Sequence, residues 1–321
     1  MAPERVSFLI VGSPRSGTTL VQRLAGELPG VRVPFETHFF TKGLDCFEAV
    51  GGFPLDRRAL ACGLEAYCEL PALEGSGLDA DAVADRLGNA GAVRALDVFD
   101  AVVREAAGPT AVLGEKTPGH LAWAGRLTAL RPELRVIGVV RDPRAVIASR
   151  RGVPWGGTSS VTAQAARWLD ATRQIVELAD RLGSRMLVLR YEDVVAAPDR
   201  ARAAIAIAIG TPISTPVGPT GGPGAAPGLV WERWKARAGG PVTEDRVEHW
   251  RTVLRPSEAV AIIAVTAPVL DRFGYGGGRT RPGTALSARV RSLRDAGTRR
   301  AVELRLATLH ARVERADLGV G

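Results

Sequence analysis

The feature that most constrains the fold is a short apolar run that leads into a glycine-spaced loop and then a helical pattern. The run VSFLIVG covers residues 6–12, and Gly12 and Gly17 lie five residues apart around the loop SPRSGTT. Strand, loop and helix in this order are typical of a phosphate-binding loop, in which backbone N–H groups at a helix start surround phosphate oxygens. A strand-to-helix turn with a chance glycine pattern is the simpler alternative, and the order of the elements argues against it.

Further apolar runs along the chain resemble this first strand. They are rich in Val, Ile or Leu and end in polar residues, as buried parallel strands do, and they cover residues 110–116, 135–142 and 185–193. Helical patterns separate them, over residues 17–28, 119–130, 144–151 and 162–182. The alternation predicts an α/β fold with a central parallel sheet flanked by helices, similar to P-loop nucleotide-binding proteins. Ligands in such sheets bind at the carboxyl ends of the strands.

The chain divides into a predicted domain over residues 1–275 and a basic helical C-terminal extension over residues 276–321. Within the domain, eleven of the nineteen residues from 210 to 228 are Gly or Pro, which predicts a flexible loop or a cover over a site. Apolar residues beyond residue 285 recur at helical spacing beside arginines. Such a helix docks on its own domain, pairs with a second chain as a homodimer, or lies on an anionic surface; the break at Gly297 favours the first two.

Charge and cysteine content exclude several classes of protein. The net charge is +8, but the segment 279–321 holds ten arginines and four acidic residues, so +6 belongs to the tail and +2 to the rest. We therefore predict no nucleic-acid partner. Three cysteines without a CxxC spacing indicate a reducing compartment and no metal site. The start resembles no secretion signal and the apolar runs are too short to span a bilayer, so we expect a cytoplasmic protein without a transmembrane segment.

The loop lacks the lysine that nucleoside triphosphatases place on the β- and γ-phosphates. Thr18 stands in its position, Thr19 follows, and the loop's one cation is Arg15. A triphosphatase also needs Mg²⁺ held by a downstream aspartate, for which Asp142 is a poor match. The loop therefore suits a smaller anionic group, such as a 5′-phosphate held by backbone amides, Arg15 and two hydroxyls.

At these residues the chain resembles a known family. PRSGTT, at residues 14–19, is similar to the 5′-phosphosulfate loop of sulfotransferases that use 3′-phosphoadenosine 5′-phosphosulfate (PAPS). VVRDPRAVIAS resembles their second motif, whose Arg and Ser, here Arg141 and Ser149, hold the 3′-phosphate. A strand end and the following helix can converge on one phosphate, with Arg offering its fork and Ser a hydroxyl. Taken alone, RDP is also an ordinary turn before a helix with Pro143 at its first position.

The resemblance implies a metal-independent enzyme that moves a sulfuryl group from PAPS to a hydroxyl of a small-molecule, lipid-linked or glycan acceptor. It extends, more loosely towards the end, over about 275 residues. It assigns the nucleotide to Arg15, Ser16, Gly17, Thr18, Thr19, Arg141 and Ser149, with Tyr191 of LRYEDVV against the adenine. VTEDRVEHW resembles a late segment that closes over the 3′-phosphate side, which adds Thr243 and Arg246.

The catalytic residues implied by the resemblance are Glu36, Lys116 and Arg15. Glu36 of VPFETHFF lies where tyrosylprotein sulfotransferases and many bacterial relatives have their catalytic glutamate, and Lys116 of GEKTP matches a lysine near the transferring group. The chain departs from steroid- and phenol-type enzymes, because Arg15 replaces their loop lysine and no histidine matches their base. Glu36 then becomes the general base.

Each of these residues also has a simpler interpretation. Glu36 is otherwise a solvated loop carboxylate, Lys116 a surface charge before a proline turn, and Tyr191 a core residue. His38 lines the acceptor site or has a structural role. Two rival functions stay open: a P-loop nucleotide or small-molecule kinase, which Mg²⁺-dependent ATP turnover would indicate, and an inactive nucleotide-binding protein, which PAPS binding without turnover would indicate.

Overall fold

The computed structural model describes residues 5–88, 92–154, 156, 159–213, 240 and 242–276. The Gly/Pro-rich loop predicted over residues 210–228 lies outside the described residues from 214 onwards. The C-terminal extension lies outside them from 277 onwards. The loop, the extension and the domain boundary at residue 275 therefore stay predictions.

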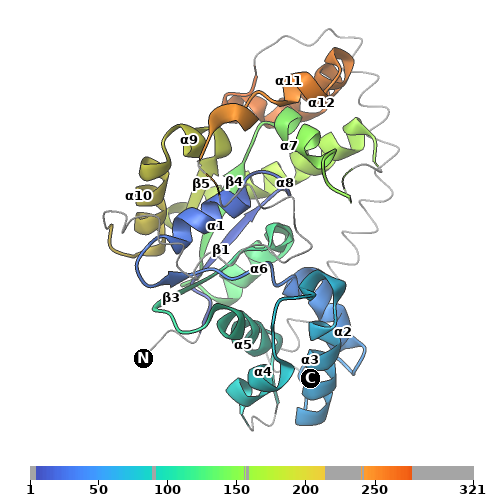
Figure 1. Ribbon diagram of the computed structural model, residues 1–321, viewed down its shortest axis with the longest axis vertical. Helices are drawn as coiled ribbons and strands as arrows, with labels where there is room; N and C mark the ends of the chain where they lie inside the picture. The colour runs from blue at the N-terminus through green and yellow to red at the C-terminus, as the bar shows by residue number, and fades with distance from the viewer. Residues whose placement is uncertain are drawn as a thin grey trace.

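A five-stranded parallel sheet forms the centre of the molecule, in the strand order β2-β3-β1-β4-β5 (Figure 1). Its strands are β1 (Phe8–Gly12), β2 (Val31–Arg32), β3 (Val112–Glu115), β4 (Arg135–Val140) and β5 (Met186–Arg190). The first strand lies in the middle, paired with β3 on one side and with β4 on the other. The predicted α/β fold with a central parallel sheet is confirmed.

The strands end earlier than the sequence analysis predicts, because their terminal polar residues belong to the next element. Asp142 has left β4, and its side chain accepts a hydrogen bond from the N–H of Arg144 and so caps the helix that follows. Tyr191 and Asp193, predicted as strand, already lie in helix α9 (Tyr191–Ala196). The carboxyl edge of the sheet therefore passes directly into helix starts.

The predicted helices appear as α1 (Thr18–Gly26), α6 (Leu121–Leu130), α7 (Pro143–Arg150) and α8 (Val161–Leu182). Two boundaries differ from the prediction by two residues: Pro118–His120 forms a separate 3-10 turn before α6, and α1 ends at Gly26 rather than at residue 28. Helix α10 (Pro198–Ile209) follows α9 and packs against α1 and β5.

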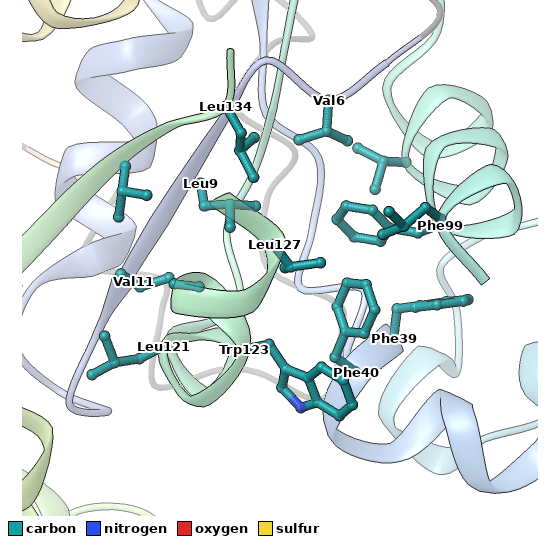
Figure 2. Packing of buried hydrophobic residues seen from close by; sticks show 14 of the residues in the cluster. Val6, Leu9, Val11, Phe39, Phe40, Phe99, Leu121, Trp123, Leu127 and Leu134 are labelled. Atoms are coloured by element: carbon teal, nitrogen blue, oxygen red, sulfur yellow. The ribbon is translucent and has the colours of Figure 1, made fainter. Parts of the chain in front are cut away.

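Residues of the central strand alternate between two hydrophobic layers. Phe8 and Ile10 belong to a core cluster with residues of α1 and α10, and Leu9 and Val11 belong to a second cluster with residues of α6 and α8, including Trp168. Figure 2 shows this second cluster around Leu9, where it continues into aromatic side chains. Since both faces of β1 are covered, its sequence is apolar throughout rather than alternating.

Residues 44–107, for which the sequence analysis assigns no element, form helices beside the sheet, in the lower part of Figure 1. They are α2 (Leu44–Glu48), α3 (Arg57–Cys68), α4 (Ala80–Leu87) and α5 (Ala95–Ala107). The ring of Phe39 joins them to the rest of the core, with its centroid 5.7 Å from that of Phe47, 5.9 Å from Tyr67 and 5.6 Å from Phe99. This helical region thus supports the chain that follows β2.

The chain over residues 243–275 is divided into short elements. These are the 3-10 turn Glu244–Arg246, α11 (Trp250–Val253), α12 (Pro256–Leu270) and the 3-10 turn Asp271–Phe273. The break precedes Pro256, which disfavours a helical conformation at Arg255 and starts α12. No single helix among the described residues is long and apolar enough to cross a membrane; the pair 244–253 and 256–273 reaches that length jointly, with a bend of 113°.

A buried ion pair ties the start of the central strand to the flanking helices. Arg131, after α6, donates to both carboxylate oxygens of Asp100 in α5, at 2.8 and 2.6 Å, and Asp100 also accepts a hydrogen bond from the N–H of Val6. Burial raises the pKa of Asp100 against the opposing effect of Arg131. Burying the Asp100 carboxylate is therefore unfavourable by itself, and its ion pair with Arg131 compensates for that cost.

We predict that Asp100→Ala lowers the free energy of unfolding by about 3–5 kcal/mol, because it leaves the Arg131 charge buried without its partner. Urea denaturation at neutral pH measures this. Glu105→Ala is the matched control: it removes the exposed 2.6 Å ion pair with Arg86 and should cost less than about 1 kcal/mol. Equal losses in the two variants would contradict the prediction.

Candidate functional site

The loop after the central strand depends on a glycine at position 17. Gly17 has φ of 98°, in the left-handed region, and a Cβ there would lie 2.3 Å from the ring of Tyr191. A side chain at this position would thus be both strained and blocked. Arg15 also has a positive φ, 77°, which is uncommon for a residue other than glycine. The loop is therefore held in a conformation that local preference alone would not select.

The loop ends in a group of hydrogen-bond donors suited to an anion. Gly17 caps α1 without a side chain, so the N–H groups of the first helical turn have no capping partner from residue 17. Ser16 is fully buried, and its Oγ has no hydrogen-bond partner among the described residues. Helix-start amides and hydroxyls of this kind bind phosphate groups, and the dipole of α1 adds positive potential.

Arg141 lies beside this loop, buried with 7% of its surface exposed. Its guanidinium donates to the backbone carbonyls of Arg15, at 3.4 Å, and Arg246, at 2.6 Å, and lies 4.0 Å from the centroid of the Tyr191 ring. It forms no ion pair with any described residue, and burial lowers its pKa, against neighbouring groups such as Tyr191 and Glu192. Because carbonyls and an aromatic ring do not neutralise the guanidinium charge, that charge can attract an anionic ligand.

The residues predicted for the two ends of the nucleotide lie next to each other. Arg15, assigned to the 5′ side, donates from Nε to the hydroxyl of Ser149, assigned to the 3′ side, at 3.1 Å. Tyr191 packs on Gly17 and Arg141 and is only 9% exposed. Its contact with an adenine stays a prediction.

The late segment covers one end of the site. Thr243 is exposed, and its hydroxyl donates to the carboxylate of Asp245. The side chain of Arg246 lies 3.6 Å from the other Asp245 oxygen, while its carbonyl accepts the hydrogen bond from Arg141. The backbone of Arg246, rather than its side chain, thus holds the central arginine in this structure.

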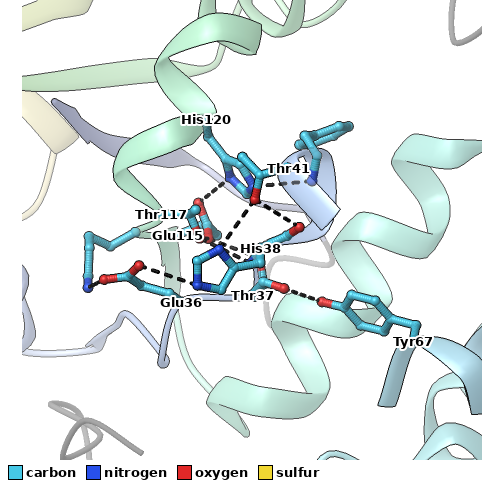
Figure 3. A network of polar contacts seen from close by, with 10 residues as sticks. Glu36, Thr37, His38, Thr41, Tyr67, Glu115, Thr117 and His120 are labelled. Atoms are coloured by element: carbon cyan, nitrogen blue, oxygen red, sulfur yellow. Dashed lines mark hydrogen bonds and ion pairs between the residues drawn. The ribbon is translucent and has the colours of Figure 1, made fainter. Parts of the chain in front are cut away.

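Glu36 and Lys116 form an ion pair at the opposite end of the site. Lys116 Nζ donates to Glu36 Oε1 at 2.6 Å, although 80 residues separate them in sequence. The lysine side chain is 1% exposed and the glutamate side chain 13%. The alternative that made Lys116 a surface charge is therefore wrong. Figure 3 shows Glu36 beside His38, whose Nε2 lies 3.5 Å from Glu36 Oε2.

A buried polar network lies directly beneath this pair, and the sequence analysis did not predict it. Glu115, fully buried, accepts hydrogen bonds from Thr37 at 2.9 Å and Thr117 at 2.6 Å, and lies 2.8 Å from Nδ1 of His120 (Figure 3). Burial alone would raise the pKa of Glu115, but His120 and the two hydroxyls outweigh it and hold the pKa below its ordinary value. The sequence motif GEKTP contains Glu115 and Thr117, so it was the sequence signal from which this network could have been predicted.

These residues surround one cleft of about 1200 Å³. Of the predicted site residues, those that line it are Arg15, Gly17, Thr18, Thr19, Glu36, Arg141, Ser149, Tyr191, Thr243 and Arg246. Ser16 and Lys116 are buried beneath its wall instead. Thr41 and Lys42, which no motif singled out, line the end next to Glu36 and His38. The volume accommodates a nucleotide together with a second molecule.

Comparison with known proteins gives a family match. A sequence model of the sulfotransferase family matches residues 7–215, which include the loop, Glu36, Lys116, Arg141 and Tyr191. No curated protein sequence matches the chain.

Solved structures with a similar fold include two sulfotransferase domains. The domain from the curacin biosynthetic pathway has a TM-score of 0.57 at 18% identity, over 85% of this chain and 99% of that domain. The domain from the olefin synthase of Synechococcus PCC 7002 has a TM-score of 0.54 at 20% identity, over 86% of this chain and 97% of that domain. At 18% and 20% sequence identity, the similarity to these two domains shows a shared fold.

The histidine beside Glu36 provides a test of the site's electrostatics. Burial lowers the pKa of His38 from 6.5 to about 4, against the opposing effect of Glu36. The unfolded chain therefore binds a proton between pH 6.5 and 4 that the folded chain does not, so the folded state loses stability as the pH falls through this window.

We predict that lowering the pH from 7 to 5 costs the wild-type protein roughly 2 kcal/mol more unfolding free energy than it costs His38→Asn. Asparagine is the suitable replacement, because it tolerates the left-handed conformation of residue 38, whose φ is 53°. Urea denaturation of both proteins at the two pH values measures the difference. An equal loss in both would mean that His38 is not held neutral by burial.

Proposed function

The chain belongs to the sulfotransferase family, and we propose that it transfers the sulfuryl group of PAPS to a hydroxyl of a small-molecule, lipid-linked or glycan acceptor. The observation that carries the proposal is one cleft that joins two kinds of chemistry. At one end are the loop donors and the buried Arg141, and at the other end is the Glu36–Lys116 pair. The first set suits a nucleotide with two anionic ends, and the second suits a proton transfer.

The donors around the loop would hold the nucleotide. Backbone N–H groups at the start of α1, with Arg15 and the hydroxyls of residues 16, 18 and 19, fit the 5′-phosphosulfate end. Arg141 and Ser149 fit the 3′-phosphate, because the arginine is buried without a carboxylate partner among the described residues. Thr243 and Arg246 would cover this end, and Tyr191 would contact the adenine with the part of its ring that Gly17 and Arg141 leave uncovered.

The residues at the other end of the cleft would carry the chemistry. PAPS, when bound, supplies an electrophilic sulfuryl group and leaves as adenosine 3′,5′-bisphosphate. Arg15 and Lys116 stabilise negative charge on the transferring and leaving oxygens, as cations do in phosphoryl transfer. Glu36 takes the proton of the attacking hydroxyl. Its hydrogen bond with Lys116, at 2.6 Å, fixes the carboxylate at the cleft wall, and His38, Thr41 and Lys42 face the acceptor.

We expect Arg141→Ala to abolish most of the preference for adenosine 3′,5′-bisphosphate over AMP. A charged hydrogen bond contributes about 1.5–3 kcal/mol, so the ratio of the two dissociation constants should fall by roughly 10- to 100-fold. Calorimetric titration with both nucleotides measures the ratio, which corrects for any general loss of binding.

Arg144→Ala is the matched control for this prediction. Arg144 lies three residues further along the same motif, but its guanidinium pairs with Asp142 and packs over Trp250. It should keep the preference. If wild-type protein binds the two nucleotides equally, the assignment of Arg141 to the 3′-phosphate is wrong.

We predict that Glu36→Gln lowers the turnover number by about 10²–10⁴-fold, because the amide keeps the shape of the side chain but cannot accept the proton. The affinity for adenosine 3′,5′-bisphosphate should be unchanged, and the acidic limb of the pH–rate profile should disappear. Glu105→Gln, the same change at a carboxylate that pairs with Arg86 and does not line the cleft, should leave the turnover number unchanged. Turnover of Glu36→Gln at the wild-type rate would exclude Glu36 as the base and make His38 the next candidate.

A further inference from the structure

Two segments that are far apart in sequence are joined residue by residue beneath the cleft. Lys116 contacts Glu36, Glu115 contacts Thr37, and the N–H of His38 donates to the hydroxyl of Thr117 at 3.2 Å. The N–H of Phe40 then donates to Nε2 of His120, also at 3.2 Å (Figure 3). The chain around Glu36 is thus held by side chains from the end of β3 and from the segment after it. The two segments continue from strands β2 and β3, which pair with each other in the sheet.

The side chains of Glu36 and Thr37 lie on opposite sides of the chain where these two segments meet. The Glu36 side chain lines the cleft, whereas Thr37 is fully buried. Thr37 is held through two of its groups: its hydroxyl donates to Glu115 Oε1 at 2.9 Å, and its carbonyl accepts a hydrogen bond from the hydroxyl of Tyr67 at 2.6 Å. The backbone at position 37 is therefore fixed from two directions, one residue away from the carboxylate that faces the cleft.

Glu115 connects the two partners of the ion pair. It precedes Lys116 in the chain, and its carboxylate accepts the hydroxyls of both Thr37 and Thr117. Thr117 in turn accepts the N–H of His38, so the two residues after Glu36 and the residues on each side of Lys116 belong to the same network. Because a displacement of about 1 Å in a reacting group can cost 10²-fold in rate, this arrangement bears directly on proton transfer.

The helical region beside the sheet positions the Tyr67 hydroxyl at the Thr37 carbonyl. A Cβ at Gly43 would lie 2.6 Å from the Tyr67 ring, so the glycine allows the ring to reach the Thr37 carbonyl. The chain from Phe39 to Gly43 forms a π-helical turn, a rare element that occurs mostly at functional sites. Burial raises the pKa of Tyr67, so its hydroxyl keeps the proton that it donates.

We propose that Thr37, held by Glu115 and Tyr67, is a positioning residue that determines where the Glu36 carboxylate lies relative to Lys116 and the acceptor hydroxyl. The inference rests on the proposed function, since Thr37 acts through Glu36 as the base. It predicts that the Thr37 hydroxyl affects turnover and its pH dependence, and has no effect on nucleotide binding.

The first test is Thr37→Val, which removes the hydroxyl and nearly keeps the shape. The turnover number should fall at least about tenfold, with a shifted acidic limb in its pH profile and an unchanged dissociation constant for adenosine 3′,5′-bisphosphate. Thr37→Ser restores the hydroxyl and should recover most of the rate. Thr266→Val is the control, because Thr266 is an equally buried threonine whose hydroxyl donates within α12; it should leave turnover unchanged.

The second test repeats Thr37→Val in a Glu36→Gln background. If Thr37 acts through Glu36, it should cause no further loss there. The same fold-loss in both backgrounds, or wild-type turnover of Thr37→Val, would overturn the inference while the base assignment stands. Wild-type turnover of Glu36→Gln would instead overturn the base assignment, and the inference with it.

Tyr67→Phe gives a second route to the same answer if Thr37→Val does not fold. It removes the donor to the Thr37 carbonyl and leaves the Thr37 hydroxyl in place. The inference requires a lower turnover number with unchanged nucleotide binding, and no further loss in the Glu36→Gln background. Tyr67→Phe with wild-type turnover would contradict it.

Discussion

The position of strand β1 is the constraint on which the rest of the structure depends. It is hydrogen bonded to β3 and to β4 and buried on both faces, so its carboxyl end can lie only in the middle of the sheet edge. The segments after β3 and β4 must then leave the sheet on either side of the loop that begins at Gly12. That is why Lys116 and Arg141 come to flank a loop that is about a hundred or more residues away from each of them in sequence.

Two buried cations show how differently this protein stabilises charge. Lys116 has a carboxylate partner, Glu36, and the pair defines one end of the cleft. Arg141 has an aromatic ring and two backbone carbonyls instead, which satisfy donors without neutralising the charge. A paired cation orients its partner, whereas a cation without a carboxylate attracts an anionic ligand. The two ends of the cleft are therefore suited to different tasks by the way each charge is buried.

Patterns of short range predicted the sheet and the loop, but not the helical region that supports Glu36. Strands β1, β3, β4 and β5 and helices α1, α6, α7 and α8 follow from apolar runs and helical periodicity, which are local properties; the two-residue strand β2 is not among the predicted strands. The helices between residues 44 and 107 were not predicted, although α3, α4 and α5 are more amphipathic than the predicted helices α6 and α7. Without them the sequence offers no reason for Thr37 to be fixed, since the Tyr67 hydroxyl reaches its carbonyl across thirty residues.

The sequence by itself determined where a glycine-spaced loop between a strand and a helix would form, because two glycines, an apolar strand and a helix start act within twenty residues. It also determined that the chain alternates strands and helices, because strands that are buried on both faces are apolar throughout and so can be recognised in the sequence. Only the tertiary structure decided that Lys116 is buried against Glu36, that Tyr191 supports Gly17 and Arg141, and that Glu115 lies beneath the ion pair. These contacts depend on which segments the sheet order and the helical region bring together, and no local preference of the residues encodes that.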